Sequence, residues 1–145
     1  MMNRATIIGR LGKDPEIRHT QGGNPVASLS VATDEKWRDK NTGEKHEKTE
    51  WHRVVIFAET ACKYVENYAQ KGSLVLVEGQ IQTRKWTDQS GADRYTTEIV
   101  VRPFGSQVKI LEGFRKAGDD QGTGPASEPQ RNDFRNSDLD DEIPF

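Results

Sequence analysis

Aromatic side chains with cationic neighbours are the chemically most informative residues of this 145-residue sequence. All three tryptophans have charged neighbours, in the segments Lys36-Trp37-Arg38, Glu50-Trp51-His52-Arg53 and Arg84-Lys85-Trp86. Exposed rings can stack on nucleobases while Lys and Arg side chains bind phosphates, and this stacking tolerates any base sequence because every base has a π-face. The pattern therefore predicts a surface for single-stranded nucleic acid.

The same rings have a second interpretation, since tryptophan in a small β domain is often a core residue. Neighbouring residues of a strand point to opposite faces, so charged neighbours do not exclude a buried ring. Trp51 and Phe57 lie six residues apart and are therefore expected on one face of a strand. The sequence leaves both placements, surface and core, open.

The glycines near the start do not form a nucleotide-binding loop. Gly9 and Gly12 precede Lys13, but a Walker loop needs four residues between the glycines and Ser or Thr after the lysine, where this chain has Asp14. A backbone clamp of the KH type is an alternative. The strand-like context favours a structural bend instead.

No other catalytic or metal-binding pattern is present in the sequence. The three histidines lack metal-ligand spacing, and the single Cys62 forms neither an internal disulfide nor a zinc site of the usual four-ligand kind. We therefore predict a binding protein without catalytic residues, metal or cofactor. A metal-dependent nuclease remains an alternative that loss of labelled single strands on adding magnesium would reveal.

Short β-like segments must position the aromatic residues. Apolar patterning predicts strands over residues 6–11, 27–33, 51–58, 74–82 and 94–102, the last two joined by a hairpin that turns at 88–91. The almost entirely polar residues 38–50 predict a long charged loop.

One segment, residues 60–72, has helical periodicity. The spacing predicts a helix that Gly72 caps, with one apolar face made of Ala61, Tyr64, Val65, Tyr68 and Ala69. A helix between the third and fourth of five strands is typical of the oligonucleotide/oligosaccharide-binding (OB) fold. We therefore predict an all-β domain with one helix, a five-stranded OB-fold barrel, although small barrels of other topologies share the strand count.

The composition changes at about residue 112. Residues 1–112 contain 17 Lys and Arg and 15 Asp and Glu, whereas residues 113–145 contain 4 and 8 and few large apolar side chains. So little apolar surface does not offset the ~1–2 kcal/mol per residue that backbone ordering costs. We expect a folded domain over 1–112, a disordered linker over 113–137 and an acidic tip over 138–145.

The acidic tip has features of a docking motif. Acidic tails often serve only solubility, but here apolar residues follow the acids. A terminal ring and carboxylate fit a partner pocket, while acidic side chains contact a basic rim. The candidate partner-binding residues are Asp138, Asp140, Asp141, Glu142, Ile143, Pro144 and Phe145.

These motifs together resemble those of the bacterial-type single-stranded DNA-binding protein family. The similar segments are Gly9-Arg10-Leu11-Gly12-Lys13-Asp14-Pro15-Glu16, Thr49-Glu50-Trp51-His52-Arg53-Val54-Val55, Lys71-Gly72-Ser73, Thr83-Arg84-Lys85-Trp86-Thr87-Asp88-Gln89-Ser90-Gly91, Arg94-Tyr95-Thr96-Thr97-Glu98 and Asp140-Asp141-Glu142-Ile143-Pro144-Phe145. The resemblance implies a homotetramer that wraps single-stranded DNA and a tip that recruits replication and repair enzymes.

The resemblance also implies roles for individual residues. His52 is expected at or near a subunit contact, and the residues that stack on bases are Trp37, Trp51, Phe57 and Trp86. Our candidates for phosphate contact are Arg53, Lys71, Arg84 and Lys85.

With no apolar run of the ~18 residues that a membrane span needs and no signal peptide, we expect a soluble, cytoplasmic, nucleoid-associated protein. Two rival functions are an OB-fold protein that prefers RNA and a scaffold whose functional part is the tip.

Overall fold

The computed structural model describes residues 1–113, and the predicted tip and all but the first residue of the predicted linker lie outside this range. The described elements are β1 (Ala5–Leu11), β2 (Glu16–His19), β3 (Pro25–Arg38), β4 (Lys45–Ile56), α1 (Glu59–Tyr68), β5 (Leu74–Thr87), β6 (Asp93–Val101) and β7 (Gln107–Glu112). Within this range, no helix is long and apolar enough to cross a membrane.

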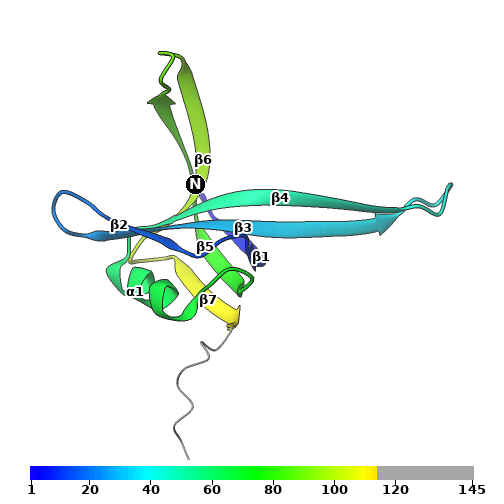
Figure 1. Cartoon of the computed structure of the whole chain (residues 1–145), viewed down its shortest axis with the longest axis horizontal. Helices are drawn as coiled ribbons and strands as arrows, with labels where there is room; N and C mark the ends of the chain where they lie inside the picture. The colour runs from blue at the N-terminus through cyan, green and yellow to red at the C-terminus, as the bar shows by residue number, and fades with distance from the viewer. Residues whose placement is uncertain (114–145) are drawn as a thin grey trace, which may run out of the picture. The chain divides into compact units, whose positions relative to one another are not determined.

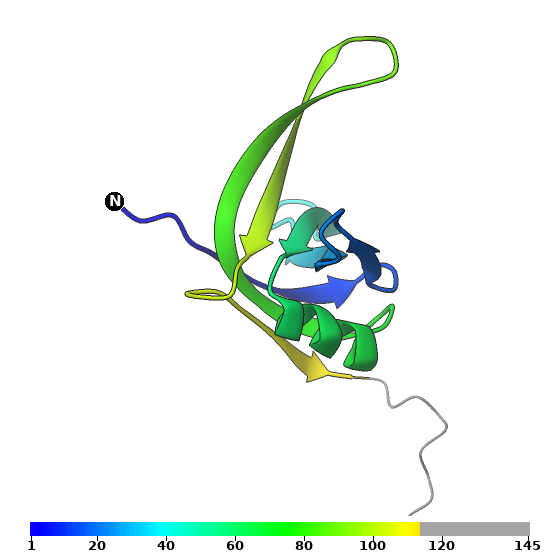
Figure 2. The ribbon, with the colours of Figure 1, turned by 90° about the vertical axis from the view of Figure 1, so that its left-hand side faces the viewer.

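Five of the strands form a closed barrel (Figures 1 and 2). Their order is β1-β3-β4-β6-β5, and β5 pairs back with β1. Every pairing is antiparallel except the short parallel pair of β4 and β6. This arrangement, with α1 between the third and fourth barrel strands, confirms the predicted OB-fold barrel. The short β2 and β7, which the sequence did not predict, pair with β3 and β5.

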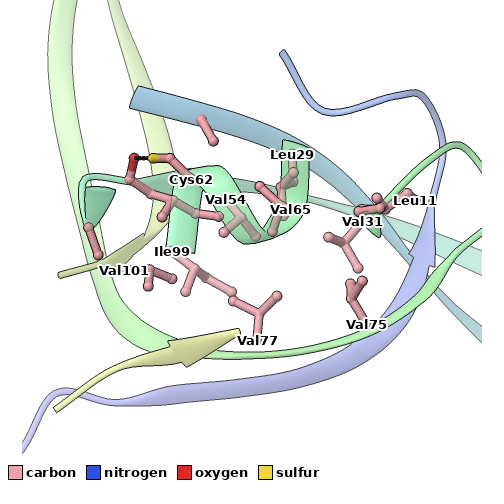
Figure 3. Close-up of a cluster of buried hydrophobic side chains, with 14 residues drawn as sticks. Leu11, Leu29, Val31, Val54, Cys62, Val65, Val75, Val77, Ile99 and Val101 are labelled. Atoms are coloured by element: carbon pink, nitrogen blue, oxygen red, sulfur yellow. Dashed lines mark hydrogen bonds between the residues drawn. The ribbon is translucent and has the colours of Figure 1, made fainter. Parts of the chain in front are cut away.

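The barrel interior is apolar because alternate residues of each strand point inward. Two residues of α1, Cys62 and Val65, join this core (Figure 3). The Cys62 Sγ–H donates to the carbonyl of Ile56 at 3.3 Å, and burial raises the pKa of this thiol. The strand residues of the core include Leu11, Leu29, Val31, Val54, Ile56, Val75, Val77, Ile99 and Val101.

Two hairpins continue beyond the barrel as arms that project in different directions (Figure 1). The first arm consists of residues 32–51 of the β3–β4 hairpin, and the second of residues 82–98 of the β5–β6 hairpin.

The long charged loop predicted over 38–50 is wrong in its extent, because β3 continues to Arg38 and β4 begins at Lys45, so that residues 39–44 alone connect the two strands. Cross-strand polar contacts stabilise the arm, such as Lys36 Nζ to Glu47 Oε1 at 3.6 Å. Its strands carry polar residues on both faces, so apolar alternation did not reveal them.

Helix α1 is shorter than predicted. It ends at Tyr68, and the Ala69 N–H donates to the carbonyl of Val65. Gly72 is therefore not its cap; with φ of 89° it lies in the turn before β5, where its N–H donates to the Leu11 carbonyl at 2.8 Å. Tyr68 of the predicted apolar face is 63% exposed.

Candidate nucleic-acid interface

All four predicted stacking rings lie on the protein surface. The exposed fractions are 49% for Trp37, 60% for Trp51, 46% for Phe57 and 42% for Trp86. Core packing, which the sequence left open, is therefore excluded as their role. Apolar rings exposed to this extent are available to a ligand.

Strand register puts Trp51, Arg53 and Phe57 on the outer face of the barrel. Their neighbours Val54 and Ile56 are fully buried, so the alternate side chains point outward. Trp51 pairs with Ala32 of β3, and Arg53 pairs with Ser30. Small partners leave the indole and the guanidinium clear of cross-strand packing. The result is a surface on which a ring and a cation stand side by side.

Close packing against Gly12 positions the Trp51 ring. A Cβ at Gly12 would lie 2.3 Å from Cζ3 and 2.7 Å from Cη2 of the indole. A Cβ at Gly9 would lie 2.2 Å from the Ala32 carbonyl oxygen. Both glycines thus permit close contacts within the protein, which supports the structural interpretation over a KH-type clamp.

A groove of about 500 Å³ lies beside Phe57 on this outer face. It is lined by β2, the start of β3, the end of β4 and the outward residues of β5 and β6, and its charged residues are Lys13, Glu16, Arg18, Arg53, Arg84 and Glu98. Four cations against two acids make the groove locally cationic, although the folded domain is nearly neutral. Such a groove can accept the phosphates of a strand whose bases stack nearby.

Sequence reasoning identified Arg53 and Arg84 in this groove but missed Lys13 and Arg18. Arg18 lies on β2, whose four residues were not recognised as a strand. The alternation of Glu16 and Arg18 with the apolar Ile17 was the available signal. Lys13 lies in the connection just before β2.

A buried carboxylate holds Arg84 at the groove. The Arg84 Nε–H donates to Glu98 Oε1 at 3.1 Å, and the Glu98 side chain is 8% exposed. Since this acceptor is fixed in the barrel wall, the guanidinium has a defined place at the base of the second arm.

Trp86 has the same strand parity as Arg84 and so lies on the same face of β5. Its indole N–H donates to Thr96 Oγ1 at 2.8 Å, which restrains the ring. The cross-strand partner is Arg94, whose Nε–H donates to Asp88 at 2.9 Å. Hydrogen bonds from Ser90 and Arg94 lower the pKa of Asp88 to about 2, so the hairpin turn carries an ionised carboxylate at neutral pH.

The other predicted site residues lie apart from this surface. Trp37 stacks on His46 with ring centroids 5.6 Å apart, and continuous register places it on the opposite face of the first arm from Trp51. Lys85 lies on the opposite face of β5 from Trp86 and pairs with Asp93 at 3.1 Å. Lys71 is in the turn before β5 and does not line the groove.

Two further contacts concern predicted residues. His52 Nε2 lies 2.8 Å from Thr33 Oγ1, which places this imidazole in a hydrogen bond between β3 and β4. The Arg102 guanidinium carbon lies 5.7 Å from the centroid of the Phe57 ring. One cation therefore already accompanies Phe57 in the protein itself.

The chain is similar to known proteins over nearly its whole length. The chain is 45% identical over 170 residues to the single-stranded DNA-binding protein of Rhizobium meliloti (strain 1021), covering 99% of this chain and 98% of the relative. It is 47% identical over 148 residues to the protein of that name from Rickettsia typhi (strain ATCC VR-144 / Wilmington), covering 99% and 97%.

A solved structure, the Plasmodium falciparum SSB complex with ssDNA, matches with a TM-score of 0.70 and 37% sequence identity. The match covers 77% of this chain and 96% of the other. Residues 2–111 match the Single-strand binding protein family. The chain therefore belongs to the single-strand binding protein family, which consists of binding proteins rather than enzymes, as its sequence predicted.

Proposed function

We propose that this chain binds single-stranded DNA without strong sequence preference and keeps it unpaired during replication, recombination and repair. The observation that carries the proposal is a cationic groove that the exposed Phe57 ring lines, with Trp51 and Trp86 two residues away from its Arg53 and Arg84 on the same strand faces. Bases stack on Trp51, Phe57 and Trp86, and phosphates accept hydrogen bonds from Arg53 and Arg84. These interactions use groups common to all nucleotides, so they do not select a base sequence.

Trp37, Lys71 and Lys85 contribute in a different way under this proposal. Trp37 and Lys85 lie on the arm faces opposite Trp51 and Trp86. A strand that contacts both faces has to pass around the edge of an arm, which is consistent with wrapping. Lys71 would contact phosphates beyond the groove.

Replacement of Trp51 or Trp86 by Ala tests the stacking proposal. Each change is expected to weaken binding of a labelled dT oligomer by about 1–3 kcal/mol, or about 5- to 150-fold. Saturating DNA is expected to quench most tryptophan emission of the unchanged protein. Tyr68→Ala, which removes an exposed ring on α1, is the control and should leave binding unchanged. Unchanged affinity in both tryptophan variants would refute the proposal, and stronger binding of an equal-length RNA would favour the RNA alternative.

Gly12→Ala tests whether the position of the Trp51 ring matters. The φ angle of Gly12 is not positive, so Ala fits the backbone and any effect comes from the displaced indole. We expect a shifted emission maximum and a loss of affinity smaller than that of Trp51→Ala. The control is Gly22→Ala, where a new Cβ has no neighbour closer than 3.8 Å. Equal affinity of both glycine variants would show that the ring tolerates displacement.

We further propose that the chain assembles as a homotetramer with His52 at or near a subunit contact. The exposure of apolar Ile8 (52%) and Ile81 (49%) on the barrel supports this, because assembly covers such side chains. Sedimentation equilibrium is expected to give four times the 16.4 kDa chain mass at micromolar concentration. A stable monomer under these conditions contradicts the assembly proposal.

The tip is proposed to recruit partner enzymes and to compete with DNA for the groove. Residues 113–145 contain four basic and eight acidic residues, and attachment through the same chain gives the tip a high effective concentration at the groove. The attraction is electrostatic and weakens above about 0.15 M salt, where the Debye length is ~8 Å.

Deletion of residues 138–145 tests both roles of the tip. We expect DNA affinity to stay equal or rise slightly, most visibly at low salt, and partner recruitment to be lost. Removal of Phe145 alone is expected to abolish recruitment, because its ring is the proposed anchor. The measurements are DNA titration at two salt concentrations and pull-down of replication and repair enzymes. A several-fold loss of DNA affinity, or partners that bind the tailless chain, contradicts this proposal.

A further inference from the structure

Glu16 is an acid placed among the cations of the groove. Its Oε1 lies 2.8 Å from the ammonium of Lys13, and its Oε2 lies 3.9 Å from Nη2 of Arg18. The two carboxylate oxygens thus each face a different cation. Arg53, one of the candidate phosphate contacts, lines the same groove.

The charge of Glu16 is stabilised where it lies. The Lys13 ammonium lowers the pKa of this carboxyl, by hydrogen bond and by charge, and the charges of Arg18 and Arg53 add to the effect. The side chain is therefore an anion at neutral pH. It has one negative charge shared by two oxygen atoms, as a phosphodiester has.

Comparison with Glu98 shows what is particular to Glu16. The Glu98 side chain is 8% exposed, so its carboxylate would be buried without a cationic partner if it separated from Arg84. The Glu16 side chain is 45% exposed and belongs to the four-residue β2. It can rotate into water at little cost and leave its cations to another anion.

We infer that Glu16 is an internal competitor for DNA phosphate, which pairs with Lys13 and Arg18 in the free protein and yields them when a strand enters the groove. The inference rests on the proposed function, since it requires that DNA phosphates occupy this groove. It makes Glu16 a residue that limits affinity instead of adding to it. It also assigns phosphate contacts to Lys13 and Arg18.

Salt dependence distinguishes this role from a general charge effect. For single strands, the logarithm of the binding constant falls with the logarithm of salt concentration by about 0.7 per phosphate neutralised. In Glu16→Gln, Lys13 and Arg18 need no exchange of partner before contacting phosphates. In the unchanged protein the Glu16 carboxylate takes up a salt cation when it loses these partners, which offsets part of the counterion release from the DNA. The variant lacks this uptake and is therefore expected to show a steeper slope than the unchanged protein.

The experiment compares Glu16→Gln with Glu59→Gln in the full chain, using a dT oligomer from low to high salt. Glu59 also pairs with a lysine, Lys63 on α1 at 3.0 Å, and does not line the groove. Both variants change the net charge equally. We expect Glu16→Gln to bind about two- to fivefold more tightly at low salt, with a steeper slope. We expect Glu59→Gln to match the unchanged protein in slope.

Adding Lys13→Gln to Glu16→Gln is expected to remove part of the gain, since one freed cation is lost. Melting curves check that each variant is folded. If the unchanged chain binds DNA and Glu16→Gln behaves like Glu59→Gln, the inference is overturned while the proposed function stands. If the unchanged chain does not bind dT, the proposed function fails and the inference fails with it.

Discussion

The pairing register of β3 with β4 is the constraint on which the candidate interface depends. It runs without interruption from Ala27 and Ile56 in the barrel to Arg38 and Lys45 near the end of the first arm. Because side chains alternate along a strand, burial of Val54 and Ile56 forces Trp51 and Arg53 outward. If the pairing of β4 with β3 shifted by one residue, the buried side chains of β4 would point to solvent and its exposed side chains would point into the core. The apolar core therefore secures the exposure of the polar and aromatic face.

Electrostatics of the groove are set by a few pairs of residues and not by the domain average. The folded part is nearly neutral, yet the groove combines four cations with two acids. Each acid has a different consequence because the two differ in burial. Glu98 keeps Arg84 in place, whereas Glu16 is exposed enough to exchange. Binding strength under the proposed function thus depends on local geometry more than on total charge.

Much of the fold could be predicted from the sequence, because apolar alternation marks strands that line a core. The five barrel strands and α1 were found in this way. The signal fails where a strand has no buried face, as in residues 45–50 of β4, and where it has four residues, as in β2. The helix end was misplaced because Gly72 serves a turn that contacts Leu11, a residue distant in sequence.

The site was less predictable than the fold for a related physical reason. The even spacing of Trp51 and Phe57 along the chain showed that they share a face of the strand. Which face of that strand points into the core depends on its packing against other strands, and the residues around Trp51 do not determine that packing. Lys13 and Arg18 belong to the groove through the pairing of β2 with β3. The contact of Gly12 with the Trp51 ring joins residues 39 positions apart. No local pattern contains such a contact.

The first arm shows how the strand register affects the path that a bound DNA strand would take. Trp37 and Trp51 lie on opposite faces of one two-stranded ribbon, which is possible because neither arm face is packed against the barrel core. Because the sequence of the first arm is mostly polar, neither face of the arm is buried, and both faces are accessible to a ligand. A single strand that follows aromatic side chains on both faces must bend around the ribbon. Under the proposed function, the DNA strand wraps around the first arm because this part of the β3–β4 hairpin, within the residues that the structure describes, has no buried face.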